Sequence, residues 1–298
     1  MTLVQEPFVL TLTFLGVGSA FAKRNDQSNA LIEAWEKGPS DQPVPDDLVL
    51  VDFGTTGPIA LHKLRGRTGF AYLDCGGTIR YNAISRIFLT HLHADHIGGL
   101  PELAGMNRHA SGDTPFRPQL IAFQDVLVDL WEHALRAGLG VLPGRVASLE
   151  DYFDPYPLLP ADQGGPDRFK LLDRYELIPF ATDHVRVHRR FDWPSFGLLL
   201  RDVMTGASAV YSGDTRFDPE TFTSKMRDAS IVFHDVQLDD NEDGIHATLA
   251  QLRTLPPPVR EKTVLYHYGD DWDSGAYAFV ADEFAGFARP HYRYVLFE

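Results

Sequence analysis

Residues 86–99 read RIFLTHLHADHIGG, and this stretch decides both the fold and the chemistry of the 298-residue chain. The compact run Arg86–Thr90 predicts a buried strand that leads directly into a polar segment. Three imidazoles and one carboxylate follow within that segment, at His91, His93, Asp95 and His96. These are too many polar groups to bury without a partner, because each needs its hydrogen-bonding atoms satisfied.

A metal site is the expected partner. Where the strand gives way to a loop, His91 and His93 can point the same way, while Asp95 and His96 turn toward a second point close by. Neutral imidazole and carboxylate suit Zn²⁺, and also Mn²⁺ or Fe²⁺. The alternative is a polar turn with incidental histidines, which this spacing directly after an apolar strand disfavours.

The rest of the chain alternates strand and helix patterns, with polar residues at strand ends, which is typical of the α/β layer class. Strands are expected at Phe8–Leu15 (half-buried), Ala30–Trp35, Leu48–Phe53, Tyr175–Phe180, Phe196–Arg201, Ala209–Ser212, Ile231–Phe233 and Thr263–Tyr266. Helices are expected at Gly57–Leu64, after His96, at Gln124–Ala137 and at Ala247–Thr254. We expect one domain over residues 1–298. Residues 138–173 show no regular period, so we expect a lid or substrate-facing insertion there.

The composition of the chain limits which classes of binding partner are expected. The formal net charge is −14 and no Lys/Arg run is present; the densest basic group is Arg186, His188, Arg189 and Arg190. Long nucleic acid is therefore a disfavoured partner, whereas a small anion remains compatible with bound metal ions. Cys75 is the one cysteine, so an intrachain disulfide is excluded. No signal peptide and no apolar span of about twenty residues is found, so we expect a cytoplasmic protein without a membrane partner. A homodimer stays open.

The residues His91–His96 match the HxHxDH signature of the metallo-β-lactamase superfamily, and HLHADHIGGLP is similar to its phosphodiesterase members. The resemblance extends from LTFLGVGSA near the start of the chain to LYHYGDD near its end. It implies a metallo-β-lactamase-like four-layer αββα sandwich, whereas periodicity indicates only α/β.

The same resemblance implies a set of ligands for two divalent metal ions, with zinc expected. His91 and His93 match the ligands of the first metal, and Asp95 with His96 matches the start of the second site. Three further ligands are implied by the contexts ELIPFATDHV, VYSGDT and VLYHY, namely His184, the bridging Asp214 and His267. His188 competes with His184 for its role. Asp52 and Asp74 also follow apolar strands, and we interpret both as structural loop carboxylates.

Two adjacent cations lower the pKa of a shared water, so the expected reaction is direct attack by metal-bound hydroxide, which Asp95 orients. Asp214 stands where zinc β-lactamases carry Cys, which disfavours a β-lactam substrate. The ATDHV context of His184 resembles the phosphodiesterase branch, including ribonuclease Z, rather than the P-G-H-T-x-G-S box of thioesterases and lactonases.

Two further boxes resemble those of ribonuclease Z. His234-Asp235-Val236 stands at its H-E-A box with Asp in place of Glu, and His246-Ala247-Thr248 matches its H-[SA]-T box. The resemblance implies that His246 donates a proton to the leaving alkoxide or contacts a phosphoryl oxygen, with Asp235 orienting it. The alternative is that His246 merely caps the following helix.

One departure from ribonuclease Z bears on the substrate. Only about thirty residues separate His184 from Asp214, so the long arm that grips transfer RNA in that family is missing. The leading hypothesis is a phosphodiesterase acting on a small cyclic or short nucleotide. A lactonase or thioesterase on the same metals, and a non-hydrolytic metal- or cofactor-binding protein, are the alternatives.

Two groups of residues have open roles. The aromatic residues Tyr152, Phe153, Tyr156 and Trp193 either stack a base or pack within the protein. The tandem Asp270-Asp271 either hydrogen-bonds a ligand imidazole or forms a solvated turn.

Overall fold

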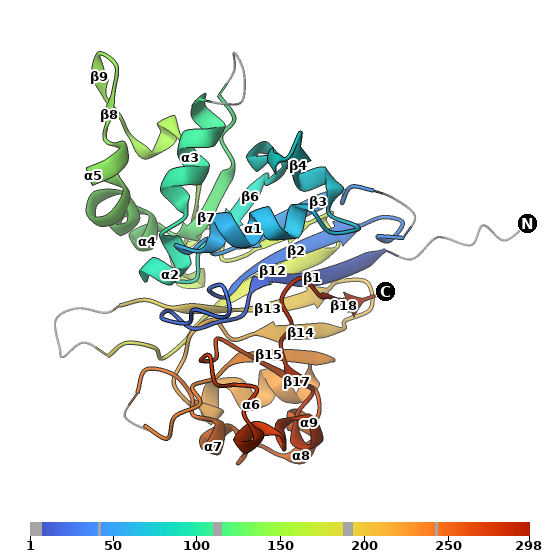
Figure 1. Cartoon of the computed structure of the whole chain (residues 1–298). Coiled ribbons are helices and arrows are strands. Elements are labelled where there is room, and N and C mark those ends of the chain that lie inside the picture. The colour runs from blue at the N-terminus through green and yellow to red at the C-terminus, as the bar shows by residue number, and fades with distance from the viewer. Residues whose placement is uncertain (1–7, 41–42, 110–114, 187–192, 242–243) are drawn as a thin grey trace, which may run out of the picture. The chain divides into compact units, whose positions relative to one another are not determined.

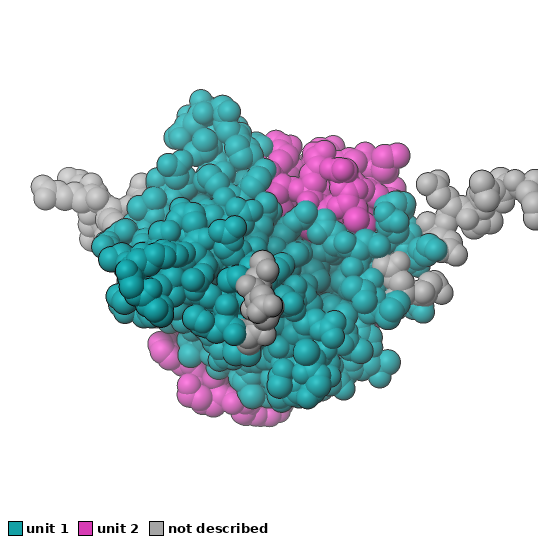
Figure 2. All heavy atoms as spheres, turned by 90° about the horizontal axis from the view of Figure 1, so that it is seen from above, with its two compact units in different colours: residues 1–15, 29–167, 293–298 teal, residues 16–28, 168–292 magenta. Residues whose placement is uncertain are grey.

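The computed structural model describes residues 8–40, 43–109, 115–186, 193–241 and 244–298. The chain divides into two compact units (Figure 2). Unit 1 contains Met1–Leu15, Asn29–Asp167 and Arg293–Glu298, and unit 2 contains Gly16–Ser28 and Arg168–Tyr292. Each unit is built on one seven-stranded sheet (Figure 1). The single domain expected over residues 1–298 stays a prediction.

The sheet of unit 1 has the strand order β10, β7, β6, β3, β2, β1, β18. Its strands are β1 (Val9–Gly16), β2 (Asn29–Trp35), β3 (Asp47–Val51), β6 (Arg86–Phe88), β7 (Gln119–Phe123), β10 (Asp154–Leu158) and β18 (Arg293–Phe297). Strands β3, β6, β7 and β10 run parallel. Because the parallel neighbours β3 and β6 end at the same edge of the sheet, the residues that follow them, Asp52 and Thr90, lie side by side.

The half-burial expected for Phe8–Leu15 is wrong, because every residue of β1 is buried. One of the alternating threonines, Thr11, finds polar partners inside the unit. Thr11 Oγ1 lies 3.4 Å from a carboxylate oxygen of the buried Glu33, and it accepts a hydrogen bond from the Trp35 indole at 3.4 Å. A threonine that has such partners does not need solvent.

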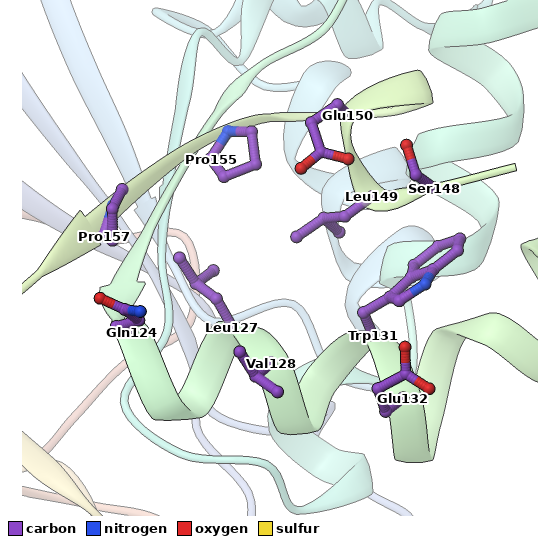
Figure 3. Close-up of a pocket in the computed structure, with 10 residues that line it drawn as sticks. All are labelled: Gln124, Leu127, Val128, Trp131, Glu132, Ser148, Leu149, Glu150, Pro155 and Pro157. Atoms are coloured by element: carbon purple, nitrogen blue, oxygen red, sulfur yellow. The ribbon is translucent and has the colours of Figure 1, made fainter.

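Helices of unit 1 flank its sheet. They are α1 (Gly57–Arg65), α2 (Ala94–Ile97), α3 (Leu100–His109), α4 (Gln124–Asp129) and α5 (Arg136–Leu139). The predicted helix Gln124–Ala137 is confirmed as α4 and α5 joined by a π-helical turn at Leu130–Leu135. A cavity of about 370 Å³ lies between α4, this turn and β10, with Leu127, Trp131 and Leu149 in its wall (Figure 3).

Residues 138–173 contain more regular structure than their sequence indicates. They include the hairpin β8 (Val141–Leu142) and β9 (Arg145–Val146), the strand β10 in parallel register with β7, and β11 (Phe169–Leu171). Tyr152 and Phe153 are 3% and 0% exposed, so these two rings pack in the core and are not placed to stack a substrate. A lid role for this segment stays a prediction.

The sheet of unit 2 has the strand order β11, β12, β13, β14, β15, β16, β17. Beyond β11, its strands are β12 (Tyr175–Ala181), β13 (Phe196–Asp202), β14 (Ser208–Tyr211), β15 (Ile231–Asp235), β16 (Thr263–Tyr266) and β17 (Gly286–Phe287). Strands β14 to β17 are parallel. The ends of β14, β15 and β16 therefore bring Asp214, Asp235 and His267 to one edge.

The remaining elements are short. Unit 2 carries α6 (Pro219–Asp228), α7 (Leu249–Leu252), α8 (Pro257–Arg260) and α9 (Val280–Glu283), and unit 1 has a small hairpin of β4 (Asp74–Cys75) and β5 (Thr78–Ile79). The 3₁₀ turns are Ala71–Leu73, Tyr81–Ala83, Leu149–Asp151, Ala161–Gln163 and Gly275–Tyr277. Among the described helices, none is long and apolar enough to cross a membrane.

Candidate functional site

The four polar residues of the segment after β6 lie close together in unit 1. His93 stands at the N-cap of α2, and Asp95 and His96 lie in that helix. His91 Nε2 is 3.0 Å from His93 Nδ1, and His96 Nε2 is 3.3 Å from an Asp95 carboxylate oxygen. The rings of His91 and His96 have centroids 4.1 Å apart. Unit 1 thus gathers one group of nitrogen and oxygen donors.

A second layer of hydrogen bonds fixes these imidazoles. Thr90 Oγ1 is 3.0 Å from His91 Nδ1, and the Asp52 carboxylate is 2.8 Å from His96 Nδ1. Asp52 also accepts hydrogen bonds from the backbone N–H and the hydroxyl of Thr90, at 2.8 and 2.7 Å. Burial raises the pKa of Asp52, and the contacts with His96 and Thr90 oppose that shift.

Asp52, interpreted from the sequence as a structural loop carboxylate, thus contacts a candidate ligand, and its role stays a prediction. The backbone of Asp52 has a φ of +60°, which is uncommon for residues other than glycine. Strained backbone of this kind persists where the surroundings enforce it, and often at functional sites. Asp74, by contrast, is confirmed as structural, since it forms an ion pair with Arg65.

In unit 2, Asp214 lies between two histidines. One of its carboxylate oxygens is 3.4 Å from His267 Nε2 and 4.0 Å from His184 Nε2. The turn that presents Asp214 needs glycine at position 213, where φ is +62° and a Cβ would collide with the Phe196 carbonyl. The hydroxyls of Thr182 and Ser195 donate to the Asp214 carbonyl at 3.1 and 3.2 Å.

Both histidines beside Asp214 donate hydrogen bonds to backbone carbonyl groups. His184 Nδ1 donates to the Ile245 carbonyl at 2.8 Å, so its Nε2 is the ring nitrogen that faces the carboxylate. Burial lowers the pKa of His184 to about 4, which keeps the imidazole in its neutral form at pH 7. The backbone N–H of His267 donates to Val17 at 2.8 Å, and its φ of +64° is again in the left-handed region.

His246 and Asp235 form a pair in the same unit. His246 Nδ1 is 2.8 Å from Asp235 Oδ2, and the Thr215 N–H donates to the same oxygen at 3.1 Å. Although burial opposes its ionisation, hydrogen bonds from His234 and His246 lower the pKa of Asp235. Thr248, rather than His246, caps α7 through a capping box, so the capping alternative for His246 is wrong.

The pair lies against the candidate ligands. Donor atoms of His184, Asp214 and His246 all lie within 4.8 Å of one another. The ring centroids of His246 and His267 are 4.5 Å apart. His246 is largely buried, with 16% of its side chain exposed. Unit 2 thus holds a second donor group, in which His246 adds an imidazole to those of His184 and His267.

Some predicted residues are not part of these groups. The Asp270 carboxylate accepts from the backbone N–H groups of Lys23 and Arg24, at 2.7 and 2.8 Å, and so anchors a loop. His188, the alternative to His184, lies outside the described residues. Trp193 lines a cavity of about 410 Å³ that His184 also lines.

The donor atoms fit a divalent metal. In His91, His96 and His184, Nδ1 is engaged by a protein oxygen while Nε2 faces another donor group, which is the usual arrangement of metal-binding histidines. Imidazole nitrogen and carboxylate oxygen are ligands shared by Zn²⁺, Mn²⁺ and Fe²⁺. The His/Asp groups therefore indicate divalent metal binding.

Comparison with solved structures supports the fold. The chain is similar to unliganded yeast PDE1, with a TM-score of 0.68, 14% identity and coverage of 98% of this chain and 100% of that one. It is also similar to the metallo-β-lactamase fold protein YhfI from Bacillus subtilis, with a TM-score of 0.66, 13% identity and coverage of 96% and 99%. At such identities the likeness shows the fold alone, and the predicted metallo-β-lactamase-like α/β fold is confirmed.

Sequence comparison gives the family. The family described as "Anti-Pycsar protein Apyc1" matches residues 10–294. The protein of that name from Paenibacillus sp. (strain J14) is 32% identical over 267 residues, which cover 89% of this chain and 91% of that protein. The one from Bacillus phage vB_BsuM-Goe3 is 32% identical over 265 residues, which cover 87% and 89%.

These matches bear on the predicted activity as well as on ancestry. The prediction of a metal-dependent hydrolase of the phosphodiesterase branch is confirmed. With a family match over nearly its whole length and relatives above 30% identity, the chain belongs to the family of the anti-Pycsar protein Apyc1.

Proposed function

We propose that this phosphodiesterase hydrolyses a small cyclic or short linear nucleotide, with His246 as the proton donor to the leaving alkoxide. The observation that carries the proposal is the Asp235–His246 pair beside His184 and Asp214. An imidazole held by a buried carboxylate next to candidate metal ligands is arranged for proton transfer rather than for packing.

The proposed metal ligands come from segments that are far apart in the sequence. They are His91, His93, Asp95 and His96 from unit 1, and His184, Asp214 and His267 from unit 2. Family membership, the order of these residues in the sequence and the donor geometry within each unit support this set. We propose that this set, Asp214 included, would hold two zinc ions.

Asp95, His246 and Asp235 are proposed to have separate roles in the reaction. Bound divalent metals supply positive charge for the phosphoryl oxygens and favour ionisation of a water molecule. Asp95 orients the attacking water. His246 is held through Nδ1 by Asp235, so its Nε2 carries the proton that the leaving alkoxide receives. Although burial opposes its ionisation, hydrogen bonds from His234 and His246 lower the pKa of Asp235, so the group that holds Nδ1 is a charged carboxylate.

A small substrate follows from the charge of the chain and its missing arm. The net charge of −14 repels a long polyanion, and the described hairpin between β12 and β13 is short. A cyclic or short nucleotide carries few charges and needs no extended basic surface.

The leaving group provides the test. With zinc or manganese bound, we would compare 3′,5′-cyclic nucleotides, which release an alkoxide, with bis(p-nitrophenyl) phosphate, which releases a much weaker base. His246→Gln should lower kcat on the cyclic nucleotide by roughly 10²–10⁴-fold and affect the nitrophenyl ester far less. Asp214→Asn should lower both activities through loss of metal, and the exposed His133→Asn serves as the matched control.

Metal content separates the outcomes. If His246→Gln lost metal and both activities equally, His246 would be a ligand and its role as proton donor would be wrong. Cleavage of a lactone or a thioester in place of every diester would overturn the proposed substrate class while leaving the metal site intact.

A further inference from the structure

The hairpin that carries His184 has an irregular register. Ala181 pairs with Phe196, whereas Val185 pairs with Trp193. The chain therefore advances four residues on one side (181 to 185) and three on the other (193 to 196). Such a bulge bends the strand and re-aims a side chain, and bulges recur beside active sites. Here the extra residue falls in the segment 182–185, which includes His184.

A cavity of about 410 Å³ lies at this bulge. Its walls are formed within unit 2 by residues 181–186 and 193–196, including His184 itself. Small-molecule sites in proteins span roughly 300–1,000 Å³, so this cavity has the size of a nucleoside rather than of an ion. Because His184, a proposed metal ligand, is among the lining residues, a molecule bound there would lie next to the ion that His184 is proposed to hold.

The lining has the chemistry of a nucleobase site. Trp193, Pro194 and Val185 give it an apolar wall, and all three side chains are partly exposed. Asp183 and Arg186 form an ion pair, with Arg186 Nε 2.9 Å from the Asp183 carboxylate. Ligand sites commonly combine an apolar, aromatic wall with a few polar groups that fix orientation.

The other aromatic residues considered for stacking on a base do not line this cavity. Tyr152 and Phe153 are buried, and Tyr156 belongs to β10 of unit 1 and is not among the cavity residues. Of the four aromatic residues that the sequence offers for stacking, Trp193 is the one that lines a cavity together with a candidate metal ligand.

We propose that the cavity between residues 181–186 and 193–196 binds the nucleobase of the substrate, with Trp193 as its stacking platform. This inference rests on the proposed nucleotide phosphodiesterase activity and names a binding residue for it. An aromatic ring stacks on a base at little entropic cost, because indole has only two rotatable side-chain bonds. The base then fixes the phosphodiester relative to His184.

The first experiment compares KM and kcat for a 3′,5′-cyclic nucleotide. Trp193→Ala should raise KM about tenfold, within the range expected for loss of one base–aromatic stack, and leave kcat within about twofold. Trp193→Phe keeps a stacking ring and should change KM by about twofold or less. The matched control is Trp131→Ala, in the wall of the unit 1 cavity, which should leave both constants unchanged (Figure 3).

A base-free analogue isolates stacking from general damage to the site. The cyclic 3′,5′-phosphate of 1-deoxyribose carries the same diester without a base. Trp193→Ala should leave its hydrolysis unchanged within about twofold. If the variant lost activity on the base-free analogue as severely as on the nucleotide, Trp193 would support the hairpin rather than bind a base. The proposal would then be wrong.

Binding gives a readout that does not depend on turnover. A phosphorothioate cyclic nucleotide, which resists hydrolysis, should quench tryptophan fluorescence in the wild-type protein and in Trp131→Phe, but not in Trp193→Phe. Retained quenching in Trp193→Phe would place the base elsewhere and overturn the inference.

Failure of the inference is distinguishable from failure of the proposed function. If the wild-type enzyme cleaves cyclic nucleotides while Trp193→Ala has unchanged constants, only the base site is wrong. If the wild-type enzyme neither cleaves nor binds any nucleotide diester, the proposed function is wrong and the base site falls with it.

Discussion

At the scale of single residues, the candidate ligands depend on partners that touch no metal. The Asp52 carboxylate contacts His96 Nδ1 at 2.8 Å and thereby fixes which ring nitrogen faces Asp95. Removing such a partner typically lowers metal affinity 10–100-fold without removing a ligand. We therefore predict that Asp52→Asn weakens zinc binding by that factor, as measured by competition with a chromogenic chelator.

Asp74→Asn is the matched control for this prediction. Asp74 also follows an apolar segment but pairs with Arg65, so its variant should bind zinc like the wild-type protein. Circular dichroism would check that both variants fold. Equal zinc affinity in Asp52→Asn and the wild-type protein would show that His96 does not depend on Asp52.

The candidate ligands were predictable one by one, but their supports were not. His91, His93, Asp95 and His96 stand together in one motif, which a single segment reveals. Asp52 reaches His96 only because β3 and β6 are parallel neighbours. The sequence of neither strand predicts that the two pair. Asp235 was found because it lies in a box similar to that of ribonuclease Z.

At the scale of elements, strands with continuous apolar runs were predictable, while the strand β10 was not. Its sequence, DPYPL, contains two prolines that cannot donate to a sheet ladder. Such a segment has a place at the edge of a sheet, and β10 is the edge strand of unit 1. The sequence shows the prolines but not the parallel partner β7, so residues 138–173 appeared irregular.

A buried ion pair joins elements of unit 2 far from the candidate site. Arg174, just before β12, donates to both carboxylate oxygens of Asp202 at the end of β13, at 3.1 and 2.8 Å. Asp202 is fully buried, whereas the Arg174 side chain is 18% exposed. We predict that Asp202→Asn lowers the free energy of unfolding by about 2 kcal/mol at pH 7, since it weakens charge-assisted hydrogen bonds. Urea denaturation measures this difference.

The pH dependence of this difference follows from the pKa of Asp202. Burial opposes its ionisation, but the hydrogen bonds from Arg174 and Met204 outweigh it and hold the pKa below the ordinary 3.8. A lowered pKa in the folded state stabilises the protein above pH 3.8, and that stabilisation is lost as the pH falls through the folded-state pKa. The difference between wild type and Asp202→Asn should thus be constant from pH 7 to about pH 5 and shrink below pH 4. A difference that instead grew toward low pH would contradict the assigned shift.

At the scale of the whole molecule, the proposed metal centre links the stability of the fold to bound zinc. Unit 1 offers His91, His93, Asp95 and His96, and unit 2 offers His184, Asp214 and His267. Neither set is the complete ligand set of two metals. If the full proposed set holds the zinc ions, zinc binds the folded chain and not the unfolded one, and each ion stabilises the fold by RT ln(1 + [Zn²⁺]/Kd).

We therefore predict that zinc raises the melting temperature of the metal-free protein, with a stabilisation of about 4 kcal/mol per bound ion when free zinc reaches a thousandfold excess over Kd. His91→Ala from unit 1 and His267→Ala from unit 2 should each lose most of this stabilisation, because each removes one ligand of the shared set. The exposed His133→Asn should keep it. Differential scanning calorimetry with a zinc titration measures all four proteins. If one of these two variants kept the full wild-type shift while the other lost it, the residue replaced in the first would not be a zinc ligand, and the proposed ligand set would be wrong.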